Sequence, residues 1–177
     1  MPTAFLGLGS NLGDRARYLA GAVAALREID PQLRTSPVYE TDPIGGPDGQ
    51  GPYLNCVVAI TSELTPLELL AEAHRLESAA GRVRRERWGP RTLDVDLLLV
   101  DEVECDGPEL TLPHPRLFDR AFVLAPLAEL EPSLVPENWR DTLGGPAAVE
   151  AMIRRVDVPI EPPEDLAGRA DVPAPWS

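Results

Sequence analysis

Residues 93–100 read Leu-Asp-Val-Asp-Leu-Leu-Leu-Val, the most apolar strand pattern in the chain. Side chains alternate along a strand, so Asp94 and Asp96 are expected to share one face, about 7 Å apart. The opposite face is expected to enter a hydrophobic core through Leu93, Val95, Leu97 and Leu99. This stretch therefore predicts a buried sheet that carries a pair of carboxylates.

Strand and helix patterns alternate on both sides of this strand. They predict further strands at 3–9, 33–40, 53–61 and 110–112, and helices at 18–30, 66–80, 118–130 and 146–156. The order β-α-β-β-α-β predicts an α+β, ferredoxin-like fold, in which an antiparallel sheet has packed helices on one face, followed here by a C-terminal extension. We expect a single domain over residues 1–157 and a proline-rich C-terminal arm over residues 158–177.

The charges are unevenly distributed along the chain. The 177 residues carry a net charge of −13, but residues 82–91 hold five arginines and one glutamate, so this segment carries +4 and the rest −17. Such a balance argues against nucleic acid or an anionic membrane as a partner. All sixteen basic residues are arginine, which excludes a Walker A lysine and a lysine Schiff base.

The composition also bears on location. No apolar run approaches the roughly 18 residues that span a bilayer, and the first residues lack the features of a secretory signal. The two cysteines, Cys56 and Cys105, are too few for a disulfide framework. We therefore expect a cytoplasmic protein that acts as a monomer on small molecules, with no nucleic-acid or membrane partner.

The acidic pair and the arginine segment together indicate phosphate chemistry. Two carboxylates on one face repel each other unless cations lie between them, and Mg²⁺ prefers such oxygen ligands together with phosphates. Arginine matches phosphate oxygens with two parallel hydrogen bonds. Either feature alone is also typical of a solvated surface, but the arginine segment ends only two residues before Asp94. Side by side, they favour phosphoryl transfer, which depends mainly on positioning and charge neutralisation.

Two other classes of function are open to the same residues. A nucleotide hydrolase or nucleotidyltransferase could use the Asp-x-Asp pair, although the Gly9-Ser10 pair lies more than eighty residues from Asp94, unlike the short spacing in polymerase-type enzymes. A non-enzymatic module could use the arginine segment to bind RNA or a protein, which the charge of −17 elsewhere opposes.

A longer stretch is more specific. Residues 87–97, Arg-Trp-Gly-Pro-Arg-Thr-Leu-Asp-Val-Asp-Leu, closely resemble the signature of the 6-hydroxymethyl-7,8-dihydropterin pyrophosphokinase family of folate biosynthesis. The resemblance covers about residues 3–135. Other matching pieces occur in order along the chain, namely Gly7–Gly13, Tyr53–Asn55, Glu77, Gly81–Arg84, Leu110–Pro115 and Arg120–Leu124.

The resemblance implies an activity and a role for individual residues. The enzyme would move diphosphate from ATP to the hydroxymethyl group of 6-hydroxymethyl-7,8-dihydropterin and release AMP. The implied catalytic residues are Arg82, Arg91, Asp94 and Asp96, with the two aspartates holding two Mg²⁺ ions. The implied pterin contacts are Thr41, Asp42, Ile44, Tyr53, Asn55, Trp88 and Phe122, with the ring between Tyr53 and Phe122. The implied ATP contacts are Leu70, His74, Glu77, Arg84, Arg87, Leu97, Thr111, His114 and Arg120.

The chain departs from the family pattern at three nucleotide-side positions. Glu109 stands where arginine is frequent, His74 where glutamine is common, and Pro115 where tyrosine is frequent. The segment 82–91 is also one residue shorter than a common form, and residues 144–177 extend beyond a short family member.

Overall fold

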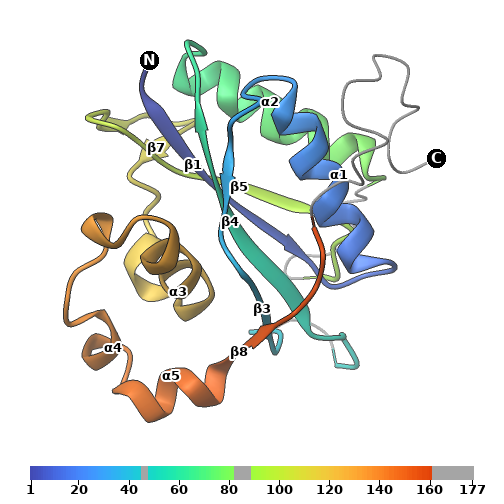
Figure 1. Ribbon diagram of the computed structural model, residues 1–177, viewed down its shortest axis with the longest axis vertical. Coiled ribbons are helices and arrows are strands. Elements are labelled where there is room, and N and C mark those ends of the chain that lie inside the picture. Colours follow the sequence, from blue (N-terminus) through green and yellow to red (C-terminus); the bar gives the residue numbers. More distant parts are fainter. Residues whose placement is uncertain (45–47, 82–88, 161–177) are drawn as a thin grey trace.

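The computed structural model describes residues 1–44, 48–81 and 89–160 and is built on one antiparallel sheet (Figure 1). Its strands are β1 (Thr3–Ser10), β2 (Arg34–Thr35), β3 (Val38–Thr41), β4 (Tyr53–Thr61), β5 (Asp94–Val100) and β8 (Ile153–Val156). Their order is β5-β1-β4-β3-β8, with β2 also pairing with β4. Because β4 lies between β1 and β3, the connection through the first helix is the split β-α-β unit expected from the sequence. The predicted antiparallel α+β fold is confirmed.

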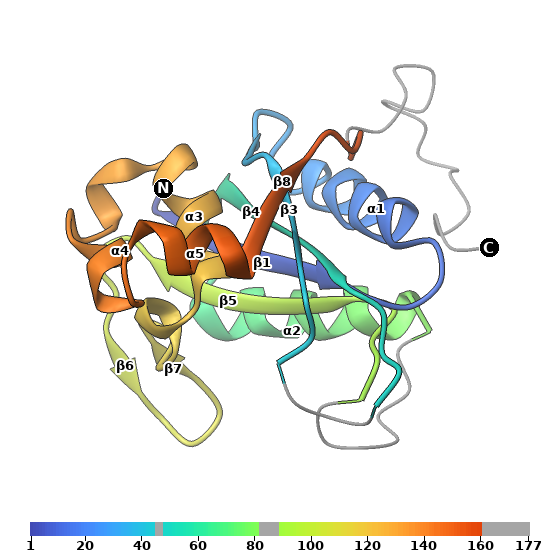
Figure 2. The same ribbon diagram turned by 90° about the horizontal axis from the view of Figure 1, so that it is seen from below.

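Helices cover both faces of this sheet (Figures 1 and 2). On one face, α1 (Arg15–Arg27) and α2 (Pro66–Ala79) pack against alternate residues of β1 and β4, such as Leu6 and Val58. On the other face, α3 (Ala121–Leu130) packs on Phe5 and Val57. The expectation of helices on one face only is therefore wrong. The central strands are apolar on both faces, so each face needs a cover.

Local signals explain where the first two helices begin. Asp14 caps α1 by accepting a hydrogen bond from the backbone of Arg17. Thr65 and Glu68 form a reciprocal capping box at the start of α2, and Pro66 occupies its first turn. These contacts satisfy backbone N–H groups that a helix start would leave unpaired.

A bulge in β5 changes which of its leucines reach each core. Leu6 of β1 pairs with Leu97, whereas the preceding Phe5 pairs with Leu99, so Leu98 is an extra residue. Leu93, Val95 and Leu97 face α1 and α2 as expected. Leu99, expected on that same face, packs instead beside Phe5 on the α3 face. The extra residue shifts the alternation by one position.

The stretch 33–40, expected as one strand, is broken at Ser36-Pro37 into β2 and β3. Proline cannot donate to a strand ladder, and the Ser36 side chain accepts the hydrogen bond of Val57 N–H instead, at 2.9 Å. The strand expected near 110–112 is β7 (Thr111–Leu112), which pairs with β6 (Cys105–Asp106). The helix expected at 118–130 is a short 3-10 turn, η1 (Leu117–Asp119), followed by α3.

The predicted helix over 146–156 is correct only in its first half. After η2 (Pro132–Leu134) and α4 (Trp139–Thr142), the helix α5 (Pro146–Met152) ends, and residues 153–156 form β8. Val149, Met152, Ile153 and Val156 have helical spacing, but the outer edge of β3 offers unpaired backbone groups. Pairing β8 with β3 from Val38↔Val156 to Thr41↔Ile153 satisfies that edge. No helix in the described ranges has the length and apolar character needed to cross a membrane.

The chain after β8 continues to contribute to the core. Ile160 is 5% exposed, and Val158 packs beside the same core cluster. Deleting residues 158–177 should therefore lower the free energy of unfolding by about 2 kcal/mol more than deleting residues 161–177 alone, because only the longer deletion removes this apolar burial. Urea denaturation of the two truncated proteins measures the difference, and equal stabilities would contradict it.

Candidate active site

One large cleft, of about 1350 Å³, brings the predicted site residues together. Four of the predicted residues, Arg82, Arg84, Arg87 and Trp88, lie outside the described residues. All the others line the cleft, namely Thr41, Asp42, Ile44, Tyr53, Asn55, Leu70, His74, Glu77, Arg91, Asp94, Asp96, Leu97, Thr111, His114, Arg120 and Phe122. They come from β3, β4, α2, β5, β7 and α3 and from the segments that join these elements.

The strand in the middle of the site, β1, has glycine at the two positions that pair with the aspartates, Gly7 and Gly9. In β1, Gly9 pairs with Asn55 of β4 on one side and with Asp94 of β5 on the other. One step along the strand, Gly7 pairs with Asp96. A Cβ at Gly9 would lie 3.2 Å from Asn55 Oδ1 and 3.9 Å from Asp94 Cβ. A Cβ at Gly7 would lie 3.5 Å from the Leu98 side chain, so the two glycines allow neighbouring side chains to approach β1 closely.

Two arginines partner the acidic pair. Arg91 Nη1 lies 2.6 Å from Asp94 Oδ2, and Arg120 Nη1 lies 3.4 Å from Asp96 Oδ2. The Arg120 guanidinium also lies over the ring of Phe122, 5.5 Å from its centroid. The sequence prediction that both carboxylates share a face with arginines nearby is thus reproduced in the geometry.

The electrostatics of the site are those of carboxylates held too close together. Burial, and then the charge of Asp94, raise the pKa of Asp96, against the opposing effects of His114, Arg120 and Arg91. Burial lowers the pKa of His114, although Asp96 opposes that shift. For Arg91, burial lowers the pKa but Asp94 outweighs it, so the net shift is upward. The positive charges of Arg91 and Arg120 therefore offset only part of the effect of burial and of Asp94 on the pKa of Asp96.

The donor set fits a magnesium ion. In the described parts of the chain, no group of three or more His, Cys, Asp or Glu side chains is arranged to hold a metal. A cation at Asp94 and Asp96 would therefore complete its shell with water and phosphate oxygens, which is how Mg²⁺ is usually bound. A divalent cation would also oppose the burial and the repulsion from Asp94 that together raise the pKa of Asp96.

Two of the predicted ATP contacts, Glu77 and His114, are held by the backbone of β5. Glu77 of α2 is buried, and its Oε1 accepts a hydrogen bond from Val95 N–H at 3.0 Å, between the two aspartates. His114 donates its backbone N–H to Leu98 O at 2.7 Å. His74 and Leu70 lie about one and two turns before Glu77 on α2. These contacts hold one wall of the cleft against the strand that carries the carboxylates.

Three of the predicted pterin contacts, Thr41, Tyr53 and Asn55, lie on β3 and β4. Asn55 is buried and donates from Nδ2 to Thr41 Oγ1 at 2.9 Å. The remaining Oδ1 and N–H of Asn55 can serve a planar ligand with complementary edges. Tyr53, two residues before Asn55, and Phe122, at the start of α3, both line the cleft. Ile44 is 70% exposed and lies in the same lining.

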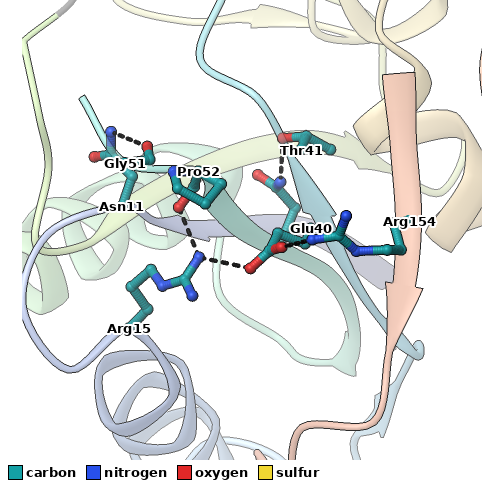
Figure 3. Close-up of polar contacts among 8 residues, drawn as sticks. Asn11, Arg15, Glu40, Thr41, Gly51, Pro52 and Arg154 are labelled. Atoms are coloured by element: carbon teal, nitrogen blue, oxygen red, sulfur yellow. Dashed lines mark hydrogen bonds and ion pairs between the residues drawn. The ribbon is translucent and has the colours of Figure 1, made fainter. Parts of the chain in front are cut away.

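One residue that the sequence analysis did not single out connects three segments of the site. Asn11 Nδ2 donates to Gly51 O at 3.2 Å (Figure 3). Asn11 also exchanges hydrogen bonds with the backbone of Arg91, since its N–H donates to Arg91 O at 3.0 Å and its Oδ1 accepts from Arg91 N–H at 2.8 Å. Its place in the Gly-Ser-Asn turn directly after β1 was the available signal.

The fold and the cleft together define a class of protein. A pair of carboxylates, each partnered by an arginine, lies on the central sheet of an α+β domain beside a hydrogen-bonding aromatic pocket. This combination is typical of enzymes that transfer phosphoryl groups from a metal-bound nucleotide.

Comparison with known proteins identifies the family. The family model described as 7,8-dihydro-6-hydroxymethylpterin-pyrophosphokinase (HPPK) matches residues 5–132. A 2-amino-4-hydroxy-6-hydroxymethyldihydropteridine pyrophosphokinase of Bacillus subtilis (strain 168) is 46% identical over 129 residues, covering 72% of this chain and 77% of the relative. One from Methylorubrum extorquens is 45% identical over 157 residues, covering 87% and 94%. The chain belongs to the HPPK family and is a pyrophosphokinase of folate biosynthesis.

Solved structures agree on the fold. A crystal structure of wild-type Plasmodium falciparum HPPK-DHPS with SDX-DHP aligns with a TM-score of 0.61 at 14% sequence identity. The alignment covers 88% of this chain but only 47% of that chain, so this chain spans about half of that protein. At this identity the likeness supports the antiparallel sheet with packed helices.

Proposed function

We propose that the cleft binds Mg-ATP and 6-hydroxymethyl-7,8-dihydropterin together and moves diphosphate from the first to the second, releasing AMP. The observation that carries the proposal is the row Asn55–Gly9–Asp94, which runs across three neighbouring strands. It sets a ring-recognising amide beside a metal-binding carboxylate with no side chain between them. A hydroxymethyl group on a bound pterin can then face the phosphates.

Asp94 and Asp96 are the proposed ligands of two Mg²⁺ ions. Bound there, the ions would neutralise phosphate charge and help to orient the triphosphate. The carboxylates suit this role because they lie on one strand face and leave most of each coordination shell to phosphate and water.

Arg91 and Arg120 are the proposed phosphate contacts among the described residues, and Arg82, Arg84 and Arg87 are proposed for the same role. In the structure, Arg91 and Arg120 pair with the two aspartates. Once cations occupy the aspartates, the guanidinium groups can turn to phosphate oxygens, for which their geometry is well matched. Each guanidinium group therefore has an anionic partner both without and with bound substrates: an aspartate in the first case and a phosphate in the second.

The pterin is proposed to lie between Tyr53 and Phe122, with its polar edge on Asn55. Thr41 fixes the amide of Asn55 through the 2.9 Å hydrogen bond, so the remaining polar atoms of Asn55 face the ligand in one orientation. The neighbouring Asp42 and Ile44, together with Trp88, complete the proposed pterin contacts. A pocket built on fixed hydrogen-bonding groups discriminates strongly against rings that lack them.

In the proposed reaction, the pterin hydroxyl oxygen attacks the β-phosphorus of ATP. A new oxygen–phosphorus bond forms, the bond between the β-phosphorus and the α–β bridging oxygen breaks, and AMP leaves. The hydroxyl proton passes to water. A loose transition state places little demand on a general base, so the residues contribute mainly by binding, orientation and charge neutralisation.

The remaining expectations stay predictions. The enzyme is proposed to act as a monomer in the cytoplasm, with ATP and the pterin as its partners and with neither nucleic acid nor membrane. The division into a domain over 1–157 and an arm over 158–177 is likewise a prediction.

Product analysis tests the proposal. The protein should form AMP only when ATP, Mg²⁺ and 6-hydroxymethyl-7,8-dihydropterin are all present, with one AMP for each pterin diphosphate. Chromatography of the nucleotides, with and without the pterin, measures this. A γ-phosphatase would instead release ADP, and a nucleotidyltransferase would release free pyrophosphate. ADP as the main product, or AMP formed equally well without the pterin, would overturn the proposal.

A further inference from the structure

An ion-pair bridge holds the base of the segment that joins β3 to β4 (Figure 3). Glu40 of β3 accepts a hydrogen bond from Arg15 Nη1 at 3.0 Å and pairs through its other oxygen with Arg154 of β8. Arg15, the first residue of α1, also donates from Nη1 to Pro52 O at 2.7 Å. We call Arg15, Glu40 and Arg154 the loop-base bridge. One guanidinium thus contacts both chain stems of residues 42–52.

The bridge lies directly behind the proposed pterin contacts. Glu40 precedes Thr41, Pro52 precedes Tyr53, and Thr41 pairs with Tyr53 across the two strands. Because side chains alternate along a strand, Glu40 faces α1 whereas Thr41 faces the cleft and Asn55. None of the three bridge residues lines the cleft. They can affect a ligand there only by placing the strand ends.

The exposed fractions of the three side chains predict the order in which their substitution should affect the protein. The Glu40 side chain is 15% exposed and that of Arg15 is 28% exposed, whereas that of Arg154 is 72% exposed. An exposed ion pair contributes little, but a mostly buried carboxylate that loses its partner pays a large desolvation cost. Arg15 also holds a backbone carbonyl, so its removal breaks two contacts. The expected order of effect is Arg15, then Glu40, then Arg154.

We propose that Arg15 and Glu40 are positioning residues for the pterin. They hold the two strand ends at the spacing at which Tyr53 and Asn55 can receive the ring. The inference rests on the proposed function, because it assigns the pterin to this side of β1. It separates the two substrates, since Asp94 and Asp96 lie on β5, on the other side of β1 from the strands β3 and β4 that the bridge holds.

Steady-state kinetics of Arg15→Met test the inference. The KM for the pterin should rise about tenfold, because small displacements of binding groups have large effects on productive geometry. The KM for ATP should stay within about twofold. Arg155→Met is the matched control, since Arg155 lies beside Arg154 on β8 and pairs at 3.0 Å with Glu129 of α3. That control should leave both Michaelis constants unchanged.

Glu40→Gln provides a second test that does not depend on how well Arg15→Met folds. It keeps the shape of the side chain but removes its charge, and the pterin KM should rise by about threefold. Arg15→Lys retains one cation and should recover part of the pterin affinity lost in Arg15→Met. A pterin KM that is unchanged in the folded variants, or pterin and ATP constants that rise by the same factor, would overturn the inference. Wild-type protein without pterin-dependent AMP formation would instead overturn the proposed function itself.

Discussion

Replacing either Asp94 or Asp96 with asparagine should lower turnover by about 10³-fold or more, since each loss removes the charge that holds a cation against the phosphates. The fold should survive, because both side chains lie in the cleft and outside the two hydrophobic cores. Asp96→Asn should melt at or above the wild-type temperature. Burial and Asp94 raise the pKa of Asp96, which means that the folded state disfavours its charged form near neutral pH.

Turnover assays together with thermal melts separate a metal-binding role from a structural one. Asp101→Asn is a suitable control, because Asp101 follows β5 at the end away from the cleft and accepts a hydrogen bond from Thr3 N–H at 3.0 Å. That control should lose some stability and keep its turnover. Wild-type turnover in Asp94→Asn or Asp96→Asn, or a melting temperature that falls together with activity, would argue against the metal assignment.

The second large effect is expected at Asn55. Asn55→Ala should lower kcat/KM for the pterin by about 10³-fold, because a ring that depends on fixed hydrogen bonds loses its partner. The KM for ATP should change little. The loss of the hydrogen bond to Thr41 should reduce stability by only about 1 kcal/mol.

Gly9→Ala tests the proposed contact between Asn55 and the pterin without removing the Asn55 side chain. Its methyl group would lie 3.2 Å from Asn55 Oδ1, so the Asn55 side chain would have to shift, whereas the 3.7 Å contact with Tyr53 Cδ1 is an ordinary van der Waals contact. The kcat/KM for the pterin should fall, by less than in Asn55→Ala. Kinetics of both variants at saturating ATP provide the measurement. A pterin kcat/KM close to wild type in Asn55→Ala would remove Asn55 from the proposed recognition set.

The acidic pair could be predicted from the sequence because alternation along a strand is a local property. Asp94 and Asp96 needed only the period of two and the arginines nearby to be assigned to one face. The strands β1, β4 and β5 and the helices α1 and α2 are also evident from the sequence, since each has its own apolar period and turn or capping residues. The other members of the predicted site are implied by the resemblance to the family, and those in the described residues all line one cleft.

What could not be predicted depends on contacts between distant segments. Ile153 and Val156 fit a helix as well as a strand, and only the open edge of β3 favours the strand. The bulge at Leu98 results from pairing with β1 and reverses the face of Leu99. Asn11 and Arg15 show no periodicity at all. Their importance comes from carbonyl groups about forty residues away that reach them only in the folded chain.

Because β1 has glycine between Asn55 and Asp94, the backbone of the sheet determines the distance between these two residues. Asn55 and Asp94 are separated by two strand-to-strand spacings, which is roughly 10 Å. That length is determined by peptide hydrogen bonds, so substitutions in the cleft can tune how tightly each substrate is held but leave the gap unchanged. Under the proposed function, an alcohol on a longer arm would overshoot the phosphates however well its ring fitted. Adapting this scaffold to such an acceptor would require a different sheet register.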